Sequence, residues 1–136
     1  MQTFLPYEDF SSSAAHLDTK RLGKQRVEAY QILRALHGLT RGWVNHPATK
    51  MWRGYEQALV LYGIAACEEW LHRSYKDTTM AKIAAYQTTN TPEMPPWLGD
   101  ERLHASHRSN LLRKDPHHYG PYGWSESSDL PYYWPV

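Results

Sequence analysis

The pattern of apolar and polar positions along the chain is typical of helices. Apolar residues recur at spacings of three and four, and no segment alternates apolar and polar residues as a half-buried strand does. Four apolar residues of the stretch 18–37 fall in one sector at about 100° per residue: Leu22, Ala29, Leu33 and Leu36. Asp18 can cap the first turn, and Gly38 can adopt the left-handed conformation that ends a helix. We therefore predict a helix from Asp18 to His37.

Two further helices are predicted in the next fifty residues. Pro47 suits the first turn of a helix that continues to about Ser74. Gly54 and Gly63 lie inside this helix, and they either weaken it or permit close packing against a neighbour. A short helix is predicted from about Thr78 to Tyr86, with Asp77 as its cap.

The last third of the chain is predicted to hold one helix and two irregular segments. The helix covers residues 101–115, with Asp100 as its cap and Pro116 at its end. Residues 88–99 contain three prolines and form an irregular connection. Residues 117–136 are too rich in glycine and proline for a helix and too aromatic for a disordered tail. The fold class is thus all-α: a compact single-domain helical bundle over residues 1–136, with an ordered aromatic-rich C-terminal tail.

Composition bounds the class of protein. A length of 136 residues suits one domain, and a hydrophobic content of 41% supplies a core. The single cysteine, Cys67, excludes an intramolecular disulfide and a cysteine-based zinc site, and is compatible with a reducing compartment. No run approaches the roughly 18 apolar residues of a membrane span, and the first residues lack the pattern of a signal peptide. We expect a cytoplasmic protein that does not bind a membrane.

Charge is strongly segregated although the net charge is only +1. Between residues 20 and 53 there are eight basic residues and one acid, Glu28. The basic residues are Lys20, Arg21, Lys24, Arg26, Arg34, Arg41, Lys50 and Arg53. Such asymmetry is typical of a face that binds a polyanion, whereas an ordinary solvated helix surface mixes charges of both signs.

Glu28 is a candidate catalytic residue. Arg21, Gln25 and Glu28 stand at i, i+4 and i+7, so they share one stripe of the predicted helix. A carboxylate among cations can stabilise a developing oxocarbenium ion of a sugar, or accept a proton from water or an amine. The alternative is an intrahelical ion pair with Lys24, which contributes only about 0.3–0.5 kcal/mol.

Histidines offer a second constellation. Asp100, His104 and His107 resemble a metal-binding helix face and would suit a small metal-dependent hydrolase. The spacing lacks the HExxH pattern, however, and no third ligand is securely placed, so we expect no metal. These histidines fit better as phosphate contacts or as partners of neighbouring helices.

Other catalytic motifs are missing from the sequence. There is no Gly-rich phosphate loop, no GxSxG and no kinase set, so we expect neither a nucleotide cofactor nor any other cofactor. A basic helix together with 6 Trp and 10 Tyr suits nucleic acid, because rings can stack on displaced bases while arginines contact phosphates. This combination favours a protein that reads distorted DNA.

Four segments of the sequence resemble the pyrimidine dimer DNA glycosylase family. They are LDTKRLGKQRVEAYQIL (17–33), NHPATKMWRGYEQAL (45–59), EEWLHRSY (68–75) and SHRSNLLRKDPHHYGPYGW (106–124). The resemblance implies a helical enzyme that bends damaged duplex DNA, displaces a base and cleaves its glycosidic bond. It also implies that an α-amino group attacks the sugar C1′ and forms a Schiff base, after which elimination cleaves the strand.

The resemblance assigns roles to individual residues. It places Glu28 on the catalytic glutamate of the family and Arg21 on its DNA-contacting face. Gln2 is too large for efficient removal of the preceding methionine, so the candidate amine is that of Met1 itself. Water activated by Glu28, or a Schiff base through Lys24 or Lys20, is left open as an alternative.

The predicted DNA face extends beyond this pair. We assign to it, in the first place, Arg21, Lys24, Gln25, Arg26 and Arg53, and in the second place His46, His107, Arg108, Arg113 and Lys114. The expected partner is damaged double-stranded DNA, bound by a monomer that is nucleoid-associated. The competing hypothesis is a non-catalytic DNA-binding or architectural protein on the same scaffold.

Overall fold

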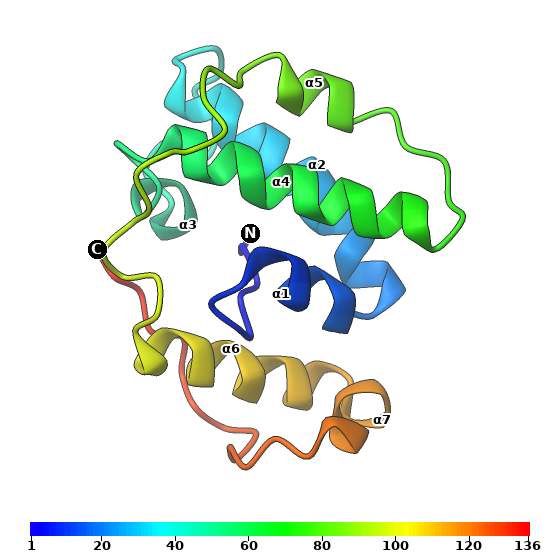
Figure 1. Cartoon of the computed structure of the whole chain (residues 1–136). Coiled ribbons are helices and arrows are strands. Elements are labelled where there is room, and N and C mark those ends of the chain that lie inside the picture. The colour runs from blue at the N-terminus through cyan, green and yellow to red at the C-terminus, as the bar shows by residue number, and fades with distance from the viewer.

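The computed structural model describes residues 1–136 as helices joined by loops, with no strand (Figure 1). This confirms the all-α class. Two long helices, α2 (Thr19–Leu36) and α4 (Glu56–His72), pack against each other, and α1 (Phe10–His16) and α5 (Met80–Ala84) pack on α4. The remaining elements are α3 (Pro47–Lys50), α6 (Glu101–Lys114), α7 (Pro116–Tyr119) and the 3₁₀ turn η1 (Gly120–Tyr122). In Figure 1, α6 and α7 form a layer on the other side of α1 from α2 and α4.

Helix α2 forms as its sequence predicts. Asp18 is the N-cap, and its carboxylate accepts a hydrogen bond from the Arg21 backbone N–H at 3.3 Å. Gly38 follows the helix with a φ of +72°, which a residue without Cβ adopts readily. Three of the four apolar residues in the predicted sector, Leu22, Ala29 and Leu33, are fully buried, and Leu36 is partly buried.

The predicted helix from Pro47 to Ser74 is wrong as a single element. It is broken into α3 and α4 by a turn in which Gly54 has a φ of +87°, a value outside the right-handed helical region. The break lets Trp52 enter the core, where its indole N–H donates to Thr3 Oγ1 at 3.1 Å. Gly63 stays inside α4 and permits close packing, because a Cβ there would lie 2.9 Å from Ile83 Cδ1.

The other helices differ in how closely they match the predicted segments. Helix α6 runs as predicted from its cap Asp100, but α5 is shorter than the predicted segment 78–86. Asp77 still accepts hydrogen bonds from the N–H groups of Thr79 and Met80, at 3.1 and 2.7 Å. Helix α1 was not predicted, because its seven residues, FSSSAAH, contain too few apolar residues to show helical spacing.

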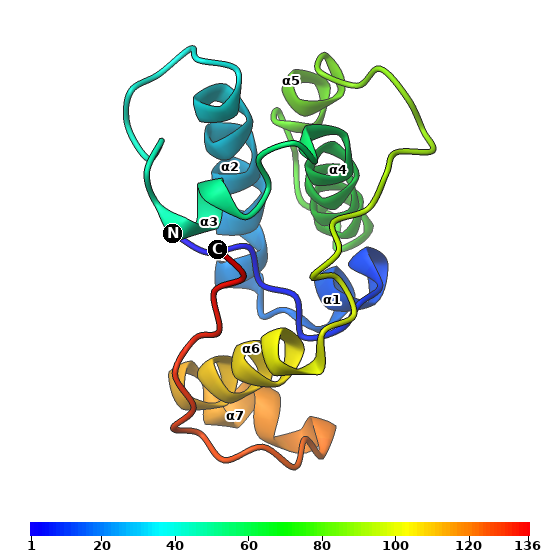
Figure 2. The same ribbon diagram turned by 90° about the vertical axis from the view of Figure 1, so that its left-hand side faces the viewer.

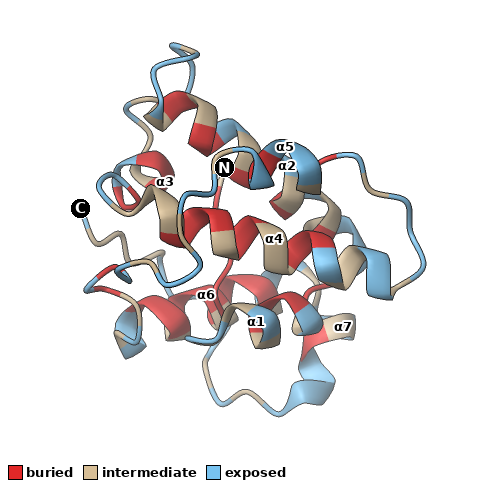
Figure 3. Ribbon diagram, turned by 45° about the horizontal axis from the view of Figure 1, so that its top comes forward, coloured by how far each residue is buried: buried red, intermediate tan, exposed pale blue.

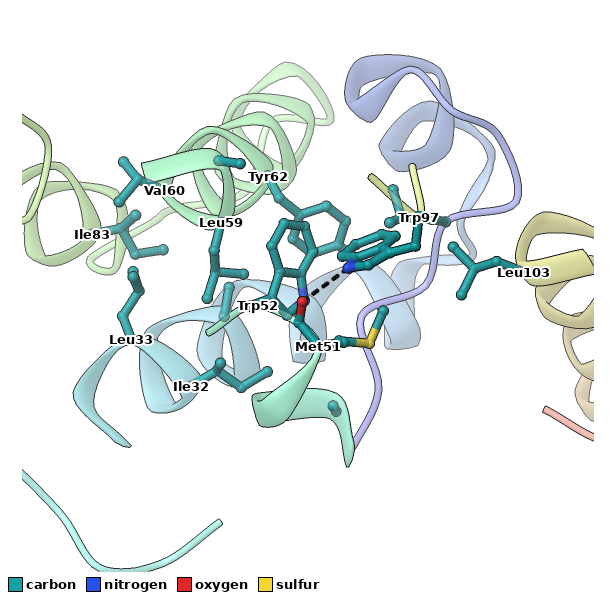
Figure 4. Close-up of a cluster of buried hydrophobic side chains, with 14 of the residues drawn as sticks. Ile32, Leu33, Met51, Trp52, Leu59, Val60, Tyr62, Ile83, Trp97 and Leu103 are labelled. Carbon is teal, nitrogen blue, oxygen red and sulfur yellow. Dashed lines mark hydrogen bonds between the residues drawn. The ribbon is translucent and has the colours of Figure 1, made fainter. Parts of the chain in front are cut away.

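The core lies between α2, α4 and α5 and extends toward residues 97–103 (Figure 4). Trp52 and Trp97 meet edge to face at 4.9 Å between ring centroids, and the Trp97 indole N–H donates to the Met51 carbonyl at 2.9 Å. Burying each such large apolar side chain contributes roughly 2–3 kcal/mol. A second cluster, containing Phe4, Leu17, Leu22, Leu111 and Tyr119, joins the layer of α6 and α7 to the rest.

The C-terminal tail is ordered along α6, as predicted (Figure 3). The N–H groups of Leu130 and Tyr133 donate to the hydroxyls of Ser109 and Ser106, at 3.0 and 3.1 Å. The prediction that this region is too punctuated for any helix is wrong for residues 117–122, which lie in α7 and η1. No helix has both the length and the apolar character that crossing a membrane requires.

Candidate active site

The N-terminal segment 2–5 is buried, and side chains satisfy its backbone. Each of its four N–H groups donates to a side chain: Gln2 to Glu28 Oε2 at 3.3 Å, Thr3 to Gln2 Oε1 at 2.9 Å, Phe4 to Gln25 Oε1 at 2.8 Å and Leu5 to His107 Nδ1 at 2.8 Å. Buried backbone groups without partners are strongly disfavoured, so these side chains fix the path of the segment. The first residue is thereby held beside α2 and α3 (Figures 1 and 2).

Two histidines of α6 hold Leu5 from the other side. His104 Nδ1 donates to the Leu5 carbonyl at 2.7 Å, while His104 Nε2 accepts from the Gly99 N–H at 3.0 Å. His107 Nδ1 accepts from the Leu5 N–H, and its ring is fully buried. Burial in the first place, and the electrostatic influence of His104 and Arg108 in the second, lower the pKa of His107 to about 3, so the ring is neutral at physiological pH.

These contacts correct two sequence-based assignments. His107 was assigned to the DNA face, but it has no exposed surface and its Nδ1 is occupied by Leu5. The metal-dependent hydrolase built on His104 and His107 also loses its basis, because both rings serve the backbone of Leu5. No three His, Cys, Asp or Glu side chains lie close enough together to hold a metal ion.

Glu28 and Gln25 are packed together at the inner end of the site. Besides the Gln2 N–H, the Glu28 carboxylate accepts a hydrogen bond from Gln25 Nε2 at 3.4 Å. Gln25 is 2% exposed, and its Oε1 also lies 2.5 Å from the Tyr62 hydroxyl. The assignment of Gln25 to the DNA face is therefore corrected, because its amide holds Phe4, Tyr62 and Glu28 in place.

The α-amine of Met1 lies close to the Glu28 carboxylate. The Gln2 nitrogen is 3.3 Å from Glu28 Oε2, and consecutive backbone nitrogens are separated by at most about 3.7 Å, so the amine lies within about 7 Å of that oxygen. His46 completes this corner of the site, where burial and the nearby N-terminal charge lower its pKa while Glu28 opposes the shift. Its Nδ1 accepts from the Ala48 N–H at 3.0 Å and so caps α3.

Glu28 opens into a cavity of about 300 Å³ with a basic rim. The cavity is lined by Met1, Gln2, Phe4, Lys20, Arg21, Lys24, Gln25, Glu28, Lys114 and Tyr132. Burial and the charges of Arg21, Arg113 and Lys24 lower the pKa of Lys114, which shows how closely the cations are gathered. Four cations around one carboxylate form a surface suited to a phosphate backbone.

The largest hollow of the molecule, about 680 Å³, lies elsewhere. Its floor is apolar, and its charged residues are Glu8, Asp9 and Glu68, which repel a polyanion. The sign of the charge therefore identifies the smaller cavity around Glu28 as the candidate active site.

Arg21 is held at the cavity rim by a chain of contacts. Its guanidinium lies 3.3 Å from the Asp18 carboxylate, which also accepts from the Tyr119 hydroxyl at 2.5 Å. Burial alone would raise the pKa of Asp18, but the hydrogen bond from Tyr119 and the charge of Arg21 outweigh it, so the pKa lies below its ordinary value. Asp18 is thus charged near neutral pH and fixes the orientation of Arg21.

Two other predicted DNA contacts are ion-paired within the protein. Arg26 pairs with Asp77 and lies 4.3 Å from the centre of the Trp70 ring. Arg108 pairs with two carboxylates, Glu101 and Glu126, and donates to the Pro6 carbonyl at 2.7 Å. The side chains of Arg26 and Arg108 are only 13% and 11% exposed, so both are structural and are removed from the DNA face.

Of the remaining predicted residues, some line the cavity and others lie outside it. It brings Lys24, Arg21 and Lys114 together around Glu28. Arg53 and Arg113 are exposed outside the cavity, where each donates to a backbone carbonyl, of Val44 and of Ser128 respectively.

Three lining residues were not predicted as part of the site: Gln2, Phe4 and Tyr132. Gln2 entered the sequence argument only through its size. No local pattern points to any of the three, because they reach the cavity only once the two chain ends have packed. Lys20, which was predicted only as an alternative nucleophile, is spaced i, i+4, i+8 with Lys24 and Glu28, and this spacing places it on the same rim.

Comparison with known proteins identifies the family of the chain. A family model described as pyrimidine dimer DNA glycosylase matches residues 1–83. The chain belongs to the pyrimidine dimer DNA glycosylase family. No match was found among curated proteins or solved structures. The matched part of this glycosylase-family chain carries Met1, Glu28 and the cations of α2, whereas Lys114 and Tyr132 lie beyond it.

Proposed function

We propose that the protein excises pyrimidine dimers from double-stranded DNA and then cleaves the strand as an abasic-site lyase. Membership of the family supports the glycosylase activity. The observation that carries the finer proposal is the 3.3 Å separation of the Gln2 nitrogen from Glu28 Oε2, inside a cavity with a basic rim. This separation supports a mechanism in which an α-amine and a carboxylate act on one sugar.

The chemistry follows from this pairing. The neutral α-amine of Met1 attacks C1′ of the damaged nucleotide, and the C1′–N1 bond breaks with departure of the base. Glu28 stabilises the positive charge that develops on the sugar and accepts a proton from the attacking amine. The protonated carboxyl of Glu28 gives this proton to the departing base. The second proton of the amine moves to O4′ as the C1′–O4′ bond breaks, which leaves a Schiff base between the amine and C1′. Abstraction of a C2′ proton then eliminates the 3′-phosphate and cleaves the strand.

The cations of the cavity rim are proposed to contact the phosphates that flank the damaged nucleotide. These cations are Lys20, Arg21, Lys24 and Lys114. They surround Glu28, so phosphate binding and sugar positioning occur together.

Reduction with borohydride tests the proposal. We expect a covalent adduct between the protein and ultraviolet-irradiated or abasic duplex, because borohydride reduces a Schiff base to a stable amine. An additional residue placed before Met1 should abolish the adduct, whereas Lys20→Ala and Lys24→Ala should keep it. The intact mass of the purified protein shows whether Met1 is retained. Strand integrity with both substrates would reject the lyase activity.

The competing non-catalytic DNA-binding function predicts salt-sensitive binding without turnover. That function does not require the first residue to lie near Glu28. The hydrogen bond from the Gln2 N–H to Glu28 therefore favours the enzymatic function. Breakage of one glycosidic bond leaves the freed base joined to its neighbour through the cyclobutane ring. Release of free pyrimidine base after photoreversal of the treated irradiated duplex, measured by chromatography, therefore separates the two functions directly.

A further inference from the structure

The hollow of about 680 Å³ beside α1 and α4 has no part in the proposed chemistry. Residues 8–11 and one side of α4 form its walls, together with Met94 and Leu98 from the connection that precedes α6. Its volume lies within the range of about 300–1,000 Å³ that is usual for binding sites. The hollow is therefore large enough to receive several side chains of another molecule.

One stripe of α4 gives the hollow apolar side chains that the core leaves uncovered. Leu61, Ile64 and Ala65 stand at i, i+3 and i+4, so they share one face of the helix. All three are only partly buried, although the other faces of α4 carry buried apolar residues as well. A helix that is apolar all round is normally covered on every side. This face of α4 therefore lacks a covering element.

Aromatic and flexible side chains complete the apolar floor of the hollow. The Phe10 ring of α1 meets the Tyr62 ring edge to face at 5.6 Å between centroids, which fixes its position. Met94 is 40% exposed. The unbranched thioether side chain of methionine adapts to surfaces of different shape, and such residues are common where a protein binds apolar segments of a partner.

The charged residues that line the hollow are all acidic. They are Glu8, Asp9 and Glu68, and no lysine or arginine lines it. Glu8 and Glu68 are exposed, and neither takes part in an ion pair. The Glu8 carboxylate lies against Gly99, where a Cβ would be 3.2 Å from it. Unpaired carboxylates beside an apolar surface are complementary to a partner that carries cations next to apolar residues.

A second hollow extends the first along α4. It measures about 290 Å³, overlaps the first at Glu68 and reaches His72. Between Leu61 and His72 the helix rises by about 16 Å, at about 1.5 Å per residue. The two hollows together form a groove, and its length corresponds to about three turns of a helix that lies along α4.

This groove lies away from the proposed DNA face. In Figure 2, α1 and α4 are on the right, whereas the first residue of the chain is on the left. The larger hollow shares no lining residue with the cavity around Glu28. A molecule that occupies the groove therefore leaves that cavity open to DNA.

We propose that the groove binds an amphipathic helical segment of another protein, whose lysines or arginines pair with Glu8 and Glu68. A helix of this kind presents apolar side chains at i, i+3, i+4 and i+7, which suit the apolar floor of the groove. The partner is a basic protein segment and not a nucleic acid, because the same carboxylates repel phosphates. The inference goes beyond the proposed function and does not depend on it, since it concerns a separate face of the molecule.

Selection from a random peptide library tests the proposal. Phage-displayed peptides of about four helical turns are selected on the immobilised full chain and counter-selected on its Leu61→Asp variant. Leu61 is only partly buried and lies outside the core cluster, and Met94→Asp, at an exposed position, replaces this variant if it does not fold. We expect enriched peptides with apolar residues three and four apart and with Lys or Arg beside them. Enrichment of acidic or uncharged peptides, or no enrichment over the counter-selection, would overturn the proposal.

Binding of one enriched peptide, measured by fluorescence anisotropy, tests the contribution of each part of the groove. The double variant Glu8→Gln, Glu68→Gln should weaken binding by at least about threefold, and less as salt is added, because exposed charge pairs are weak and screened. Leu61→Asp should weaken it by about tenfold or more, because it places a charge against apolar side chains. Leu39→Asp makes the same change at an exposed position outside the groove and should have no effect. Equal affinities for all these proteins would refute the proposal.

Two further measurements locate the peptide and exclude other occupants. In ¹H–¹⁵N spectra of the full chain, the peptide should shift the amide signals of residues 8–11, 61–72 and 94–98. Shifts confined to residues around Glu28 would place it in the wrong site. Sedimentation velocity should show a monomer without peptide, whereas a dimer that Leu61→Asp dissociates would mean that a second copy of the chain fills the groove.

Excision assays on the same variants separate this inference from the proposed function. The double variant Glu8→Gln, Glu68→Gln should excise as the wild type does, because neither residue lines the cavity around Glu28. Loss of excision in that variant would assign the groove to the DNA-binding machinery and would overturn the proposal. Peptide binding by a chain that shows no excision at all would refute only the enzymatic function.

Discussion

At the scale of single residues, Glu28 does two jobs with one carboxylate. It accepts hydrogen bonds from the Gln2 N–H and the Gln25 amide, which fix the chain end, and it faces the basic cavity where a sugar is proposed to bind. In the proposed mechanism, the side chain that holds the Gln2 N–H also meets the charge that forms when the amine reacts. The structural and the chemical role of Glu28 can therefore be separated only by a substitution that keeps the shape of its side chain.

Glu28→Gln is such a substitution. We expect excision to fall by at least about 100-fold, the usual range for loss of a general acid–base group. Binding to damaged duplex should be retained or strengthened, because a negative charge is removed from a basic surface. Single-turnover kinetics and filter binding measure the two quantities. Glu68→Gln, an exposed carboxylate at the acidic hollow, serves as control and should leave both unchanged.

The buried amide of Gln25 holds both the N-terminal segment and Glu28 in place. Gln25→Leu should lower the free energy of unfolding by about 2 kcal/mol, because the buried Phe4 N–H loses its acceptor. Denaturant titration measures the loss, and excision should fall as the chain end loosens. Gln31→Leu, an exposed change on the same helix, should cost less than about 0.5 kcal/mol. Equal losses in the two variants would show that Gln25 is not a specific support.

At the scale of elements, the N-terminal segment is an unusual component. It is buried and extends between helices without a strand to pair with, so side chains of α2 and α6 replace the usual backbone ladder. This arrangement makes the segment sensitive to the protonation of those side chains. His107 is the sensitive one, because its Nδ1 must be free of a proton to accept from Leu5.

His107 therefore predicts how stability depends on pH. Its pKa in the folded protein is about 3, below the ordinary 6.5, so the unfolded chain binds a proton between these values and the folded protein does not. The free energy of unfolding should fall by about 1 kcal/mol for each unit as pH drops from 6.5 toward 3.

Denaturant titrations at several pH values measure this slope. His107→Asn is the matched variant, since its Oδ1 can still accept from the Leu5 N–H but does not titrate. Its slope over the same window should be shallower than that of the wild type, and identical slopes would contradict the assignment.

The elements differ in how well the sequence predicts them, and each difference has a physical cause. Helices α2 and α6 were predicted because Asp18 and Asp100 cap them locally. The break between α3 and α4 was missed because the conformation of Gly54 follows from burying Trp52, a long-range event. Gln25 was misassigned for a similar reason. Helical spacing gives the direction in which a side chain points, but it does not give the residues that pack against that side chain.

At the scale of the whole molecule, the sequence predicted that the proposed DNA-binding face is positively charged, but it did not predict all the residues that form it. The excess of basic residues on α2 was visible along the chain, and the structure places three of them, Lys20, Arg21 and Lys24, around Glu28. The face is completed by Lys114 from α6 and Tyr132 from the tail, which the folding of the second layer brings in. Arg26 and Arg108 were also assigned to this face from the sequence, but Arg26 pairs with Asp77, and Arg108 pairs with Glu101 and Glu126.

This division predicts which cations govern the affinity for DNA. Lys114→Ala should weaken binding to damaged and undamaged duplex alike, and should reduce the slope of log K against log salt concentration by about 0.9, the value of one phosphate contact. Lys76→Ala, an exposed lysine outside the cavity, should leave the slope unchanged. Arg108→Ala should lower stability while keeping the salt slope, because its charge is already paired with Glu101 and Glu126. Fluorescence anisotropy over a range of salt concentrations measures all three. Equal slopes for Lys114→Ala and the wild type would mean that DNA does not cross this rim, and the binding surface would have to be sought outside the cavity around Glu28.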